Sequence, residues 1–243
     1  MRLKLIACEV MYREVCLCVA ESKNIVDVTF LTKGLHDLKQ EGMVPRLQGE
    51  INYADETKYD GILLGYGLCN NGIVGIRANK LKLIVPRAHD CITLFLGSKE
   101  RYEEYFAKNP GTYFETTGWI ERDRVNLENV SESVNRQLGV ATYDEYVRKY
   151  GEENAKYLIG IIGDWTKNYR KYAYIEMDRR LPQYEEEVKR RAKEKGWEYE
   201  RLGGNLRLLR KLIDGEWDDE DFLIVKPGEK ISVTYDRTII AAA

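Results

Sequence analysis

Four residues with metal-binding side chains follow predicted β-strands in the first part of the chain: Cys8, Cys69, His89 and Cys91. The carboxyl ends of neighbouring parallel strands meet at one edge of a sheet, so residues distant in sequence can converge there. Three thiolates and one imidazole suit zinc first, and also an iron–sulfur centre. We therefore expect a metal or metallocofactor site, although the spacing of the four residues matches no standard motif.

The loop of residues 65–72 reads GYGLCNNG and allows a second chemistry. Gly65, Gly67 and Asn70 could bring the backbone close to a bound cofactor. The loop lacks the lysine and the glycine spacing of a phosphate loop. A sharp strand-to-helix turn is also where a nucleophile elbow holds its reactive residue, so Cys69 could be the catalytic thiolate of an enzyme acting on a small acid or amide, with His89 as its base.

Packing alone is the plain alternative for any one cysteine, because free cysteine is among the most buried residue types. We expect core packing for Cys16 and Cys18, which stand in an apolar run. Tyr113 and Trp119 could wall an apolar ligand pocket, although such aromatic residues more often belong to a core. If neither chemistry holds, the chain is a non-catalytic binding or scaffold protein.

The elements that position these residues alternate between strands and helices. Apolar and β-branched runs predict strands over residues 3–7, 26–31, 59–64, 81–85, 112–116, 172–175, 197–200 and 222–225. Helical patterns follow at 73–78, 92–106, 143–162, 182–195 and 206–214. The polar segment that includes Gly42, Pro45 and Gly49 is assigned no element. This alternation predicts an α/β fold with a mainly parallel, Rossmann-like sheet.

The cysteines divide the chain into two parts. All five lie within the first 91 residues, and the strand and helix rhythm continues beyond them without another cysteine. We therefore expect two lobes: a cysteine-bearing α/β lobe over residues 1–121, and a second α/β lobe with linking helices over residues 122–243. A cleft between the lobes would hold the ligand.

Charge and hydropathy exclude several classes of partner. Lys plus Arg number 38 against 40 for Asp plus Glu, giving a net charge of -2, so no basic field attracts nucleic acid or an anionic membrane. The apolar runs are strand-sized and too short to span a bilayer. Lys4 and Glu9 interrupt any apolar signal segment at the amino terminus. We expect a cytoplasmic protein with free thiols and a small molecule or metallocofactor as its partner.

Several segments resemble a family known as domain of unknown function 1638, found in anaerobic archaea and bacteria. The resemblance rests on residues 65–69 (GYGLC), 86–91 (PRAHDC), 110–113 (PGTY) and 118–121 (GWIE), and extends over nearly the whole chain. It implies a setting in one-carbon metabolism that supports corrinoid-dependent methyl transfer. A corrinoid would then be a further cofactor, and a corrinoid protein or methyltransferase a further partner.

Overall fold

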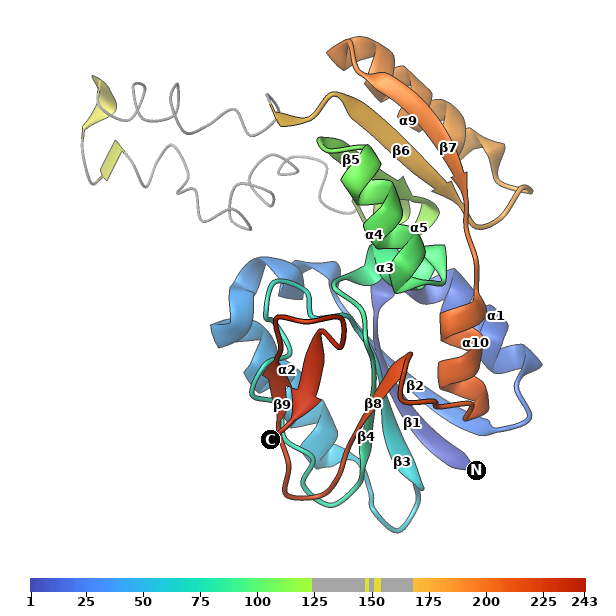
Figure 1. The fold of residues 1–243 in the computed structure, drawn as a ribbon, viewed down its shortest axis with the longest axis vertical. Helices are drawn as coiled ribbons and strands as arrows, with labels where there is room; N and C mark the ends of the chain where they lie inside the picture. Colours follow the sequence, from blue (N-terminus) through green and yellow to red (C-terminus); the bar gives the residue numbers. More distant parts are fainter. Residues whose placement is uncertain (124–146, 149–150, 154–167) are drawn as a thin grey trace.

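The computed structural model describes residues 1–123, 147–148, 151–153 and 168–243, with the side chains of residues 36–39 left aside (Figure 1). Its larger sheet contains β1 (Arg2–Cys8), β2 (Ile25–Leu31), β3 (Gly61–Gly65), β4 (Leu83–Pro86) and β8 (Phe222–Val225). The order is β2-β1-β3-β4-β8. The first four strands are parallel, and β8 runs antiparallel to β4.

Both faces of this sheet are covered, as the fully apolar β3 and β4 require. Along β1, Leu3 and Leu5 contribute to one core and Ile6 to the other, because successive side chains alternate between faces. The first face packs against α1 (Tyr12–Glu21), α3 (Cys91–Leu96) and α10 (Arg207–Asp214). The second packs against α2 (Lys39–Tyr53) and the hairpin of β9 (Ile231–Val233) and β10 (Ile240–Ala242).

A smaller sheet, with strand order β5-β6-β7, lies in the upper part of Figure 1. Its strands β5 (Thr112–Thr116), β6 (Lys171–Glu176) and β7 (Glu198–Gly203) are all parallel. Tyr172 and Tyr174 share a core with Tyr184 and Val188 of α9 (Pro182–Lys195). The other described helices are the 3-10 helices η1 (Glu9–Met11) and η2 (Lys33–Leu38) and the α-helices α4 (Lys99–Lys108) and α5 (Thr117–Asp123).

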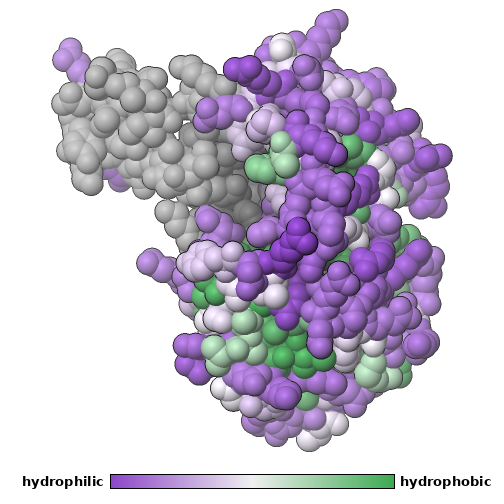
Figure 2. Space-filling model, viewed as in Figure 1, coloured by the Kyte–Doolittle hydropathy of each residue, from purple (hydrophilic) through white to green (hydrophobic). Residues whose placement is uncertain are grey.

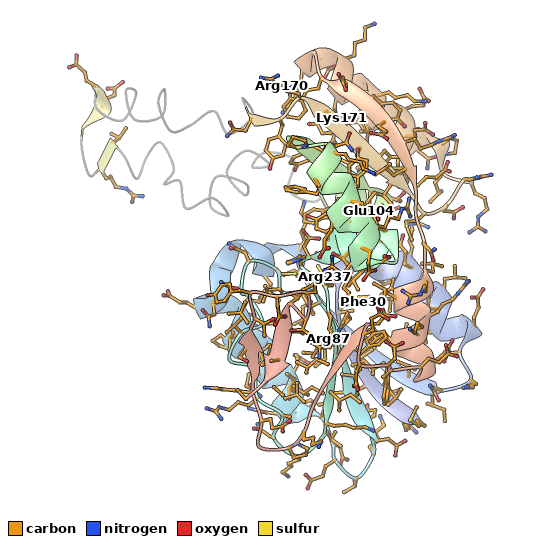
Figure 3. All side chains as sticks on the ribbon, viewed as in Figure 1. Phe30, Arg87, Glu104, Arg170, Lys171 and Arg237 are labelled. Atoms are coloured by element: carbon orange, nitrogen blue, oxygen red, sulfur yellow. The ribbon has the colours of Figure 1, made fainter. Side chains whose placement is uncertain are left out.

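The chain's final segment returns to the larger sheet, where β8 pairs with β4. Arg87, which follows β4 and is labelled in Figure 3, holds this final segment in place. Its guanidinium donates to the carbonyl oxygens of Asp219 and Thr238, each over 2.9 Å, and also to that of Ile240. The α/β class and the mostly parallel sheet are confirmed, while the lobe boundary at residue 121 stays a prediction.

Three helical predictions need correction. Residues 73–78 form turns and a bridge in place of a helix. The predicted helix 92–106 is two helices, because Gly97 adopts a left-handed φ of 74° and Ser98 caps α4. The polar segment with no assigned element is α2, which contains Pro45. The predicted linking helices at 143–162 fall largely outside the described residues.

The face shown in Figure 2 is mainly hydrophilic, and its most apolar area lies on the half that holds the larger sheet. None of the helices in the described ranges combines the length and the apolar character needed to cross a membrane.

Candidate functional site

The order of the larger sheet creates a crevice at the ends of β1 and β3. The chain passes from β1 to β2 on one side, and β3 then joins β1 on its other side. The connections leaving the two strands therefore diverge, and ligands of open α/β sheets bind at such a reversal. Cys8 is the last residue of β1, and Gly65 is the last of β3.

Three thiols line one pocket at this position: those of Cys8, Cys69 and Cys91. The remaining lining residues are Val10, Met11, Lys33, Gly65, Tyr66 and Trp119. The cavity is about 10 Å³, which is room for roughly one water molecule. The prediction that the three cysteines converge is consistent with this placement, and the pocket is called the thiol pocket below.

Cys69 is held by a turn with unusual backbone geometry. Cys69, Asn70 and Asn71 have φ values of 48°, 55° and 66°, all in the left-handed region that side chains disfavour. The amide of Leu68 donates to the carbonyl of Ala88 over 2.7 Å, and that of Cys69 to His89 over 2.8 Å. These bonds tie the turn after β3 to the loop after β4.

A close approach of backbones makes glycine necessary in the same turn. A Cβ atom on Gly67 would lie 2.8 Å from the backbone of Asp90, and one on Gly65 would lie 2.7 Å from the Cβ of Ala7. Neither contact is tolerated without movement of the backbone. The two glycines that sequence reasoning assigned to cofactor binding thus have a demonstrable packing role, and Gly65 also lines the pocket.

Cys91 is placed by a helix cap. Asp90 precedes α3, and its Oδ1 accepts hydrogen bonds from the amides of Ile92 and Thr93 over 2.9 and 3.4 Å. The other oxygen accepts from the Tyr102 hydroxyl over 2.9 Å. Capping fixes the first turn of the helix, so the side chain of Cys91, its first residue, points to the pocket.

Burial has the largest influence on the acidity of the pocket's thiols. It raises the pKa of Cys8 to about 11, and it raises the pKa values of Cys69 and Cys91 further above their ordinary value of 9.0. A medium of low polarity disfavours the charged thiolate. The negative charge of Asp90 adds to the rise for both Cys69 and Cys91. All three thiols are therefore protonated at neutral pH.

Hydrogen-bond donors act in the opposite direction at each sulfur. Backbone amides lower the pKa of Cys8 and of Cys69, and the side chain of Trp119 lowers the pKa of Cys91. The amides are that of Val10 near Cys8 and those of Gly67 and Cys91 near Cys69. Donors aimed at sulfur stabilise thiolates, and they also tune the properties of sulfur-ligated metals.

Two polar residues of the pocket were missed by sequence reasoning. Lys33 lies just beyond β2, at the same edge of the sheet, and its charge lowers the pKa of Cys8. Its ammonium stands 4.5 Å from the centre of the Trp119 ring. The Tyr66 hydroxyl is buried and has no hydrogen-bond partner among the described residues. The rule applied to the cysteines, position at or soon after the carboxyl end of a strand, would have found both.

Three predicted site residues lie elsewhere. The His89 side chain is exposed, and it does not line the thiol pocket. Asn70 is likewise exposed. Tyr113 packs against the rings of Tyr169 and Tyr172, at 5.5 and 5.4 Å. The expectation of core packing holds for Cys18 but is wrong for Cys16, which is exposed because α1 turns its other face inward.

The spacing of the thiols bears on metal binding. Within the described part of the chain, no three His, Cys, Asp or Glu side chains are close enough together to hold a metal ion as they stand. Ligation by the three cysteines would therefore require rotation about their Cα–Cβ bonds. Each of these bonds is a single torsion with three staggered positions.

Comparison with known proteins places the chain in one family. Neither a curated protein nor a solved structure matches it. A family model described as Protein of unknown function (DUF1638) matches residues 30–213, a range that includes Cys69 and Cys91 and leaves out Cys8. Because the match covers well over half of the sequence, the chain belongs to the DUF1638 family.

Proposed function

We propose that the thiol pocket binds one soft metal ion, with Zn²⁺ as the first choice, through Cys8, Cys69 and Cys91. The observation that carries the proposal is that three thiols from three separate segments of the chain line one cavity, where neighbouring N–H groups lower the pKa of each thiol. Buried thiols resist ionisation, but a bound cation supplies the missing positive charge and displaces their protons.

The cavity size favours a single ion over a larger group. A volume of about 10 Å³ accommodates neither an iron–sulfur cluster nor a corrinoid ring within the pocket as it stands. Zinc bound by three protein ligands keeps a fourth position for water or substrate. The Tyr66 hydroxyl, which is buried at 3% exposure in the same pocket, could hydrogen-bond to that fourth ligand.

The wider role that we propose is support of corrinoid-dependent methyl transfer in one-carbon metabolism, in the cytoplasm and with a corrinoid protein or methyltransferase as partner. This part rests on the sequence resemblance alone, since the description of the family names no function. We also propose that the two sheets form separate lobes, the larger of them Rossmann-like, with the ligand cleft between them. The strand order around β1 and β3 supports the Rossmann-like assignment.

A cysteine-dependent enzyme is the second candidate, and one observation favours it. Cys69 has a left-handed φ of 48° in a tight turn after a strand, which is the backbone geometry of a nucleophile elbow. Two observations oppose it: burial raises the pKa of Cys69 far above neutrality, and His89, its proposed base, is exposed. A small acid or amide also exceeds the cavity's volume.

Metal analysis of anaerobically purified protein tests the proposal. We expect about one equivalent of zinc per chain, either as purified or after reconstitution with Zn²⁺ and desalting. Cys8→Ser, Cys69→Ser and Cys91→Ser should each lower the affinity for Zn²⁺ by at least roughly tenfold, since each removes one of three ligands. Cobalt substitution should add thiolate-to-metal absorption bands that disappear in the same variants.

Cys16→Ser is the matched control, because this cysteine is exposed and lies outside the thiol pocket. It should bind zinc as the wild type does. Two results would overturn the proposal. One is stoichiometric binding that is lost only in Cys16→Ser, and the other is no stoichiometric binding of Zn²⁺, Co²⁺ or Fe²⁺ by reconstituted wild-type protein. Circular dichroism of each variant separates lost ligation from lost folding.

A further inference from the structure

A second and larger cavity lies between α1 and the smaller sheet. Its volume is about 370 Å³, within the range of small-molecule sites. Thr117, Met177 and Leu206 reach it from the segments that follow β5, β6 and β7, so it lies at the carboxyl edge of the smaller sheet. The other wall is α1, which contributes Tyr12, Arg13, Glu14, Cys16 and Leu17. None of the three proposed metal ligands takes part.

Glu14 is the one acidic group of this cavity that is buried, at 4% exposure. Its Oε2 atom has no hydrogen-bond partner among the described residues. A buried carboxylate oxygen without a partner is costly, and it persists where a ligand can satisfy it. The carboxyl group therefore marks the polar end of a binding site whose other walls include the apolar Leu17 and Leu181.

The charges around the cavity indicate what that ligand is. Arg13 is bound by Glu121, with Nε–Oε1 and Nε–Oε2 distances of 3.0 Å. Arg180 is bound by Asp178, with Nε–Oδ1 and Nε–Oδ2 distances of 2.9 and 3.1 Å. Each guanidinium is thus neutralised by its own carboxylate, and an anionic ligand would find both engaged. Among the described residues that line the cavity, Glu14 is therefore the one charged side chain without an oppositely charged partner.

We propose that this cavity binds a small organic cation, a protonated amine on an apolar body, whose N–H groups donate to Glu14. The apolar body packs against Leu17 and Leu181, and the ammonium group supplies both the positive charge and the donor that Glu14 lacks. This site is independent of the thiol pocket.

Titration of Glu14 gives the site a pH signature. Burial, together with the negative charges of Glu121 and Asp178, raises the pKa of Glu14 to about 7 against the opposing effects of its own backbone amide and of Arg13. Other titratable groups near it are Tyr174 of β6, Cys18 of α1 and, in the cavity lining, Tyr12 and Cys16. An amine binds the ionised carboxylate, so binding should be about tenfold weaker at pH 6 than at pH 8.

The test uses benzylamine as the probe and benzyl alcohol as its neutral counterpart of the same shape, with binding followed by saturation-transfer NMR and calorimetry on the full chain. Benzylamine should bind the wild type saturably and at least roughly tenfold more tightly than benzyl alcohol. Glu14→Gln keeps the shape of the side chain and should lose both this preference and the pH dependence. Leu17→Trp, at a half-exposed position, should fill the cavity and abolish binding while Glu14 is intact.

Three results would each overturn the proposal: equal binding of the two probes by the wild type, no saturable binding of benzylamine at pH 8, or an unchanged affinity of Glu14→Gln for benzylamine. Zinc binding by the thiol pocket serves as the folding control for both variants. If zinc binding fails in every protein while the benzylamine results hold, the amine site stands without the metal site.

Discussion

The amide of Cys69 donates a hydrogen bond to the carbonyl of His89 over 2.8 Å, and through this bond the turn after β3 is joined to the loop after β4. The relationship explains how Cys69 and Cys91 reach one pocket from different strands. It also shows why His89 does not join them: the residue contributes its backbone to the site, and its side chain is exposed. The positions of the Cys69 and Cys91 thiols thus depend on the hydrogen bonding between these two loops.

Alkylation rates should separate Cys16 from the pocket's cysteines. Cys16 is exposed, whereas Cys69 and Cys91 are buried and have raised pKa values, so little thiolate is present at pH 7.5. Iodoacetamide should modify Cys16 first, and the other two only after unfolding in urea. Peptide mass spectrometry of timed samples measures this. Preferential modification of Cys69 in the native protein would favour the nucleophile hypothesis.

Sequence reasoning located Cys8, Cys69 and Cys91 because a single topological rule applies to all three. Each lies at or after the carboxyl end of a strand whose apolar run is clear in the sequence, and parallel strands end at one edge. His89 follows the same rule but fails, because the rule predicts the position of a backbone and leaves the direction of a side chain open. Asp90 separates the two outcomes: it caps α3 and so fixes the first helical turn, to which Cys91 belongs and His89 does not.

Replacing Asp90 should test the helix cap. Asp90→Ala removes the acceptor for two amides and for the Tyr102 hydroxyl, so we expect a loss of about 1 to 2 kcal/mol in the free energy of unfolding. Asp90→Asn keeps a capping oxygen and should cost less than half as much. Urea unfolding of the two variants makes the comparison. Equal losses would mean that the charge of Asp90, and not its capping oxygen, stabilises the fold.

The helices were harder to predict than the strands. Helix α2 contains glycines and Pro45, residues that usually end helices, yet its inward positions Met43, Leu47 and Ile51 recur every four residues and are buried. The free energy gained by burying these side chains outweighs the local preference against a helix. The pairing of β8 with β4 could not be predicted either, since no local pattern specifies which edge of a sheet a late strand joins.

Two glycine substitutions should have opposite effects on stability. A Cβ atom on Gly118 would lie 1.7 Å from the carbonyl oxygen of Val10, so Gly118→Ala must displace α5 from η1. We expect a loss of about 3 kcal/mol or more. A methyl group added to Gly49, on α2, would meet nothing within 4 Å, so Gly49→Ala should stabilise by about 0.5 to 1 kcal/mol.

Urea unfolding with tryptophan fluorescence measures both substitutions. Trp119 follows Gly118 directly and lines the thiol pocket, so the same displacement should weaken zinc binding in Gly118→Ala and leave it unchanged in Gly49→Ala. A folded Gly118→Ala variant with the stability of the wild type would contradict the close contact between α5 and η1.

The buried Glu115 should make the protein less stable as the pH rises. It is 4% exposed, and burial raises its pKa to about 7 although Arg191 lies 3.2 Å away and Lys33 also opposes the rise. In the unfolded chain the pKa is near the ordinary 4.5. Between pH 4.5 and about 7 the folded state therefore holds a proton that the unfolded state has released, and the free energy of unfolding falls with rising pH.

The gap between these two pKa values corresponds to a contribution on the order of 3 kcal/mol, lost across that window and constant above it. Glu115→Gln resembles the protonated side chain, so it should match the wild type near pH 5 and exceed it in stability at pH 8. Urea unfolding at intervals from pH 5 to 8 gives both profiles. Because Glu14 titrates over the same window, Glu115→Gln retains a smaller slope that only the variant with both Gln substitutions should lose. Parallel profiles for the wild type and Glu115→Gln would show that Glu115 is ionised in the folded protein throughout.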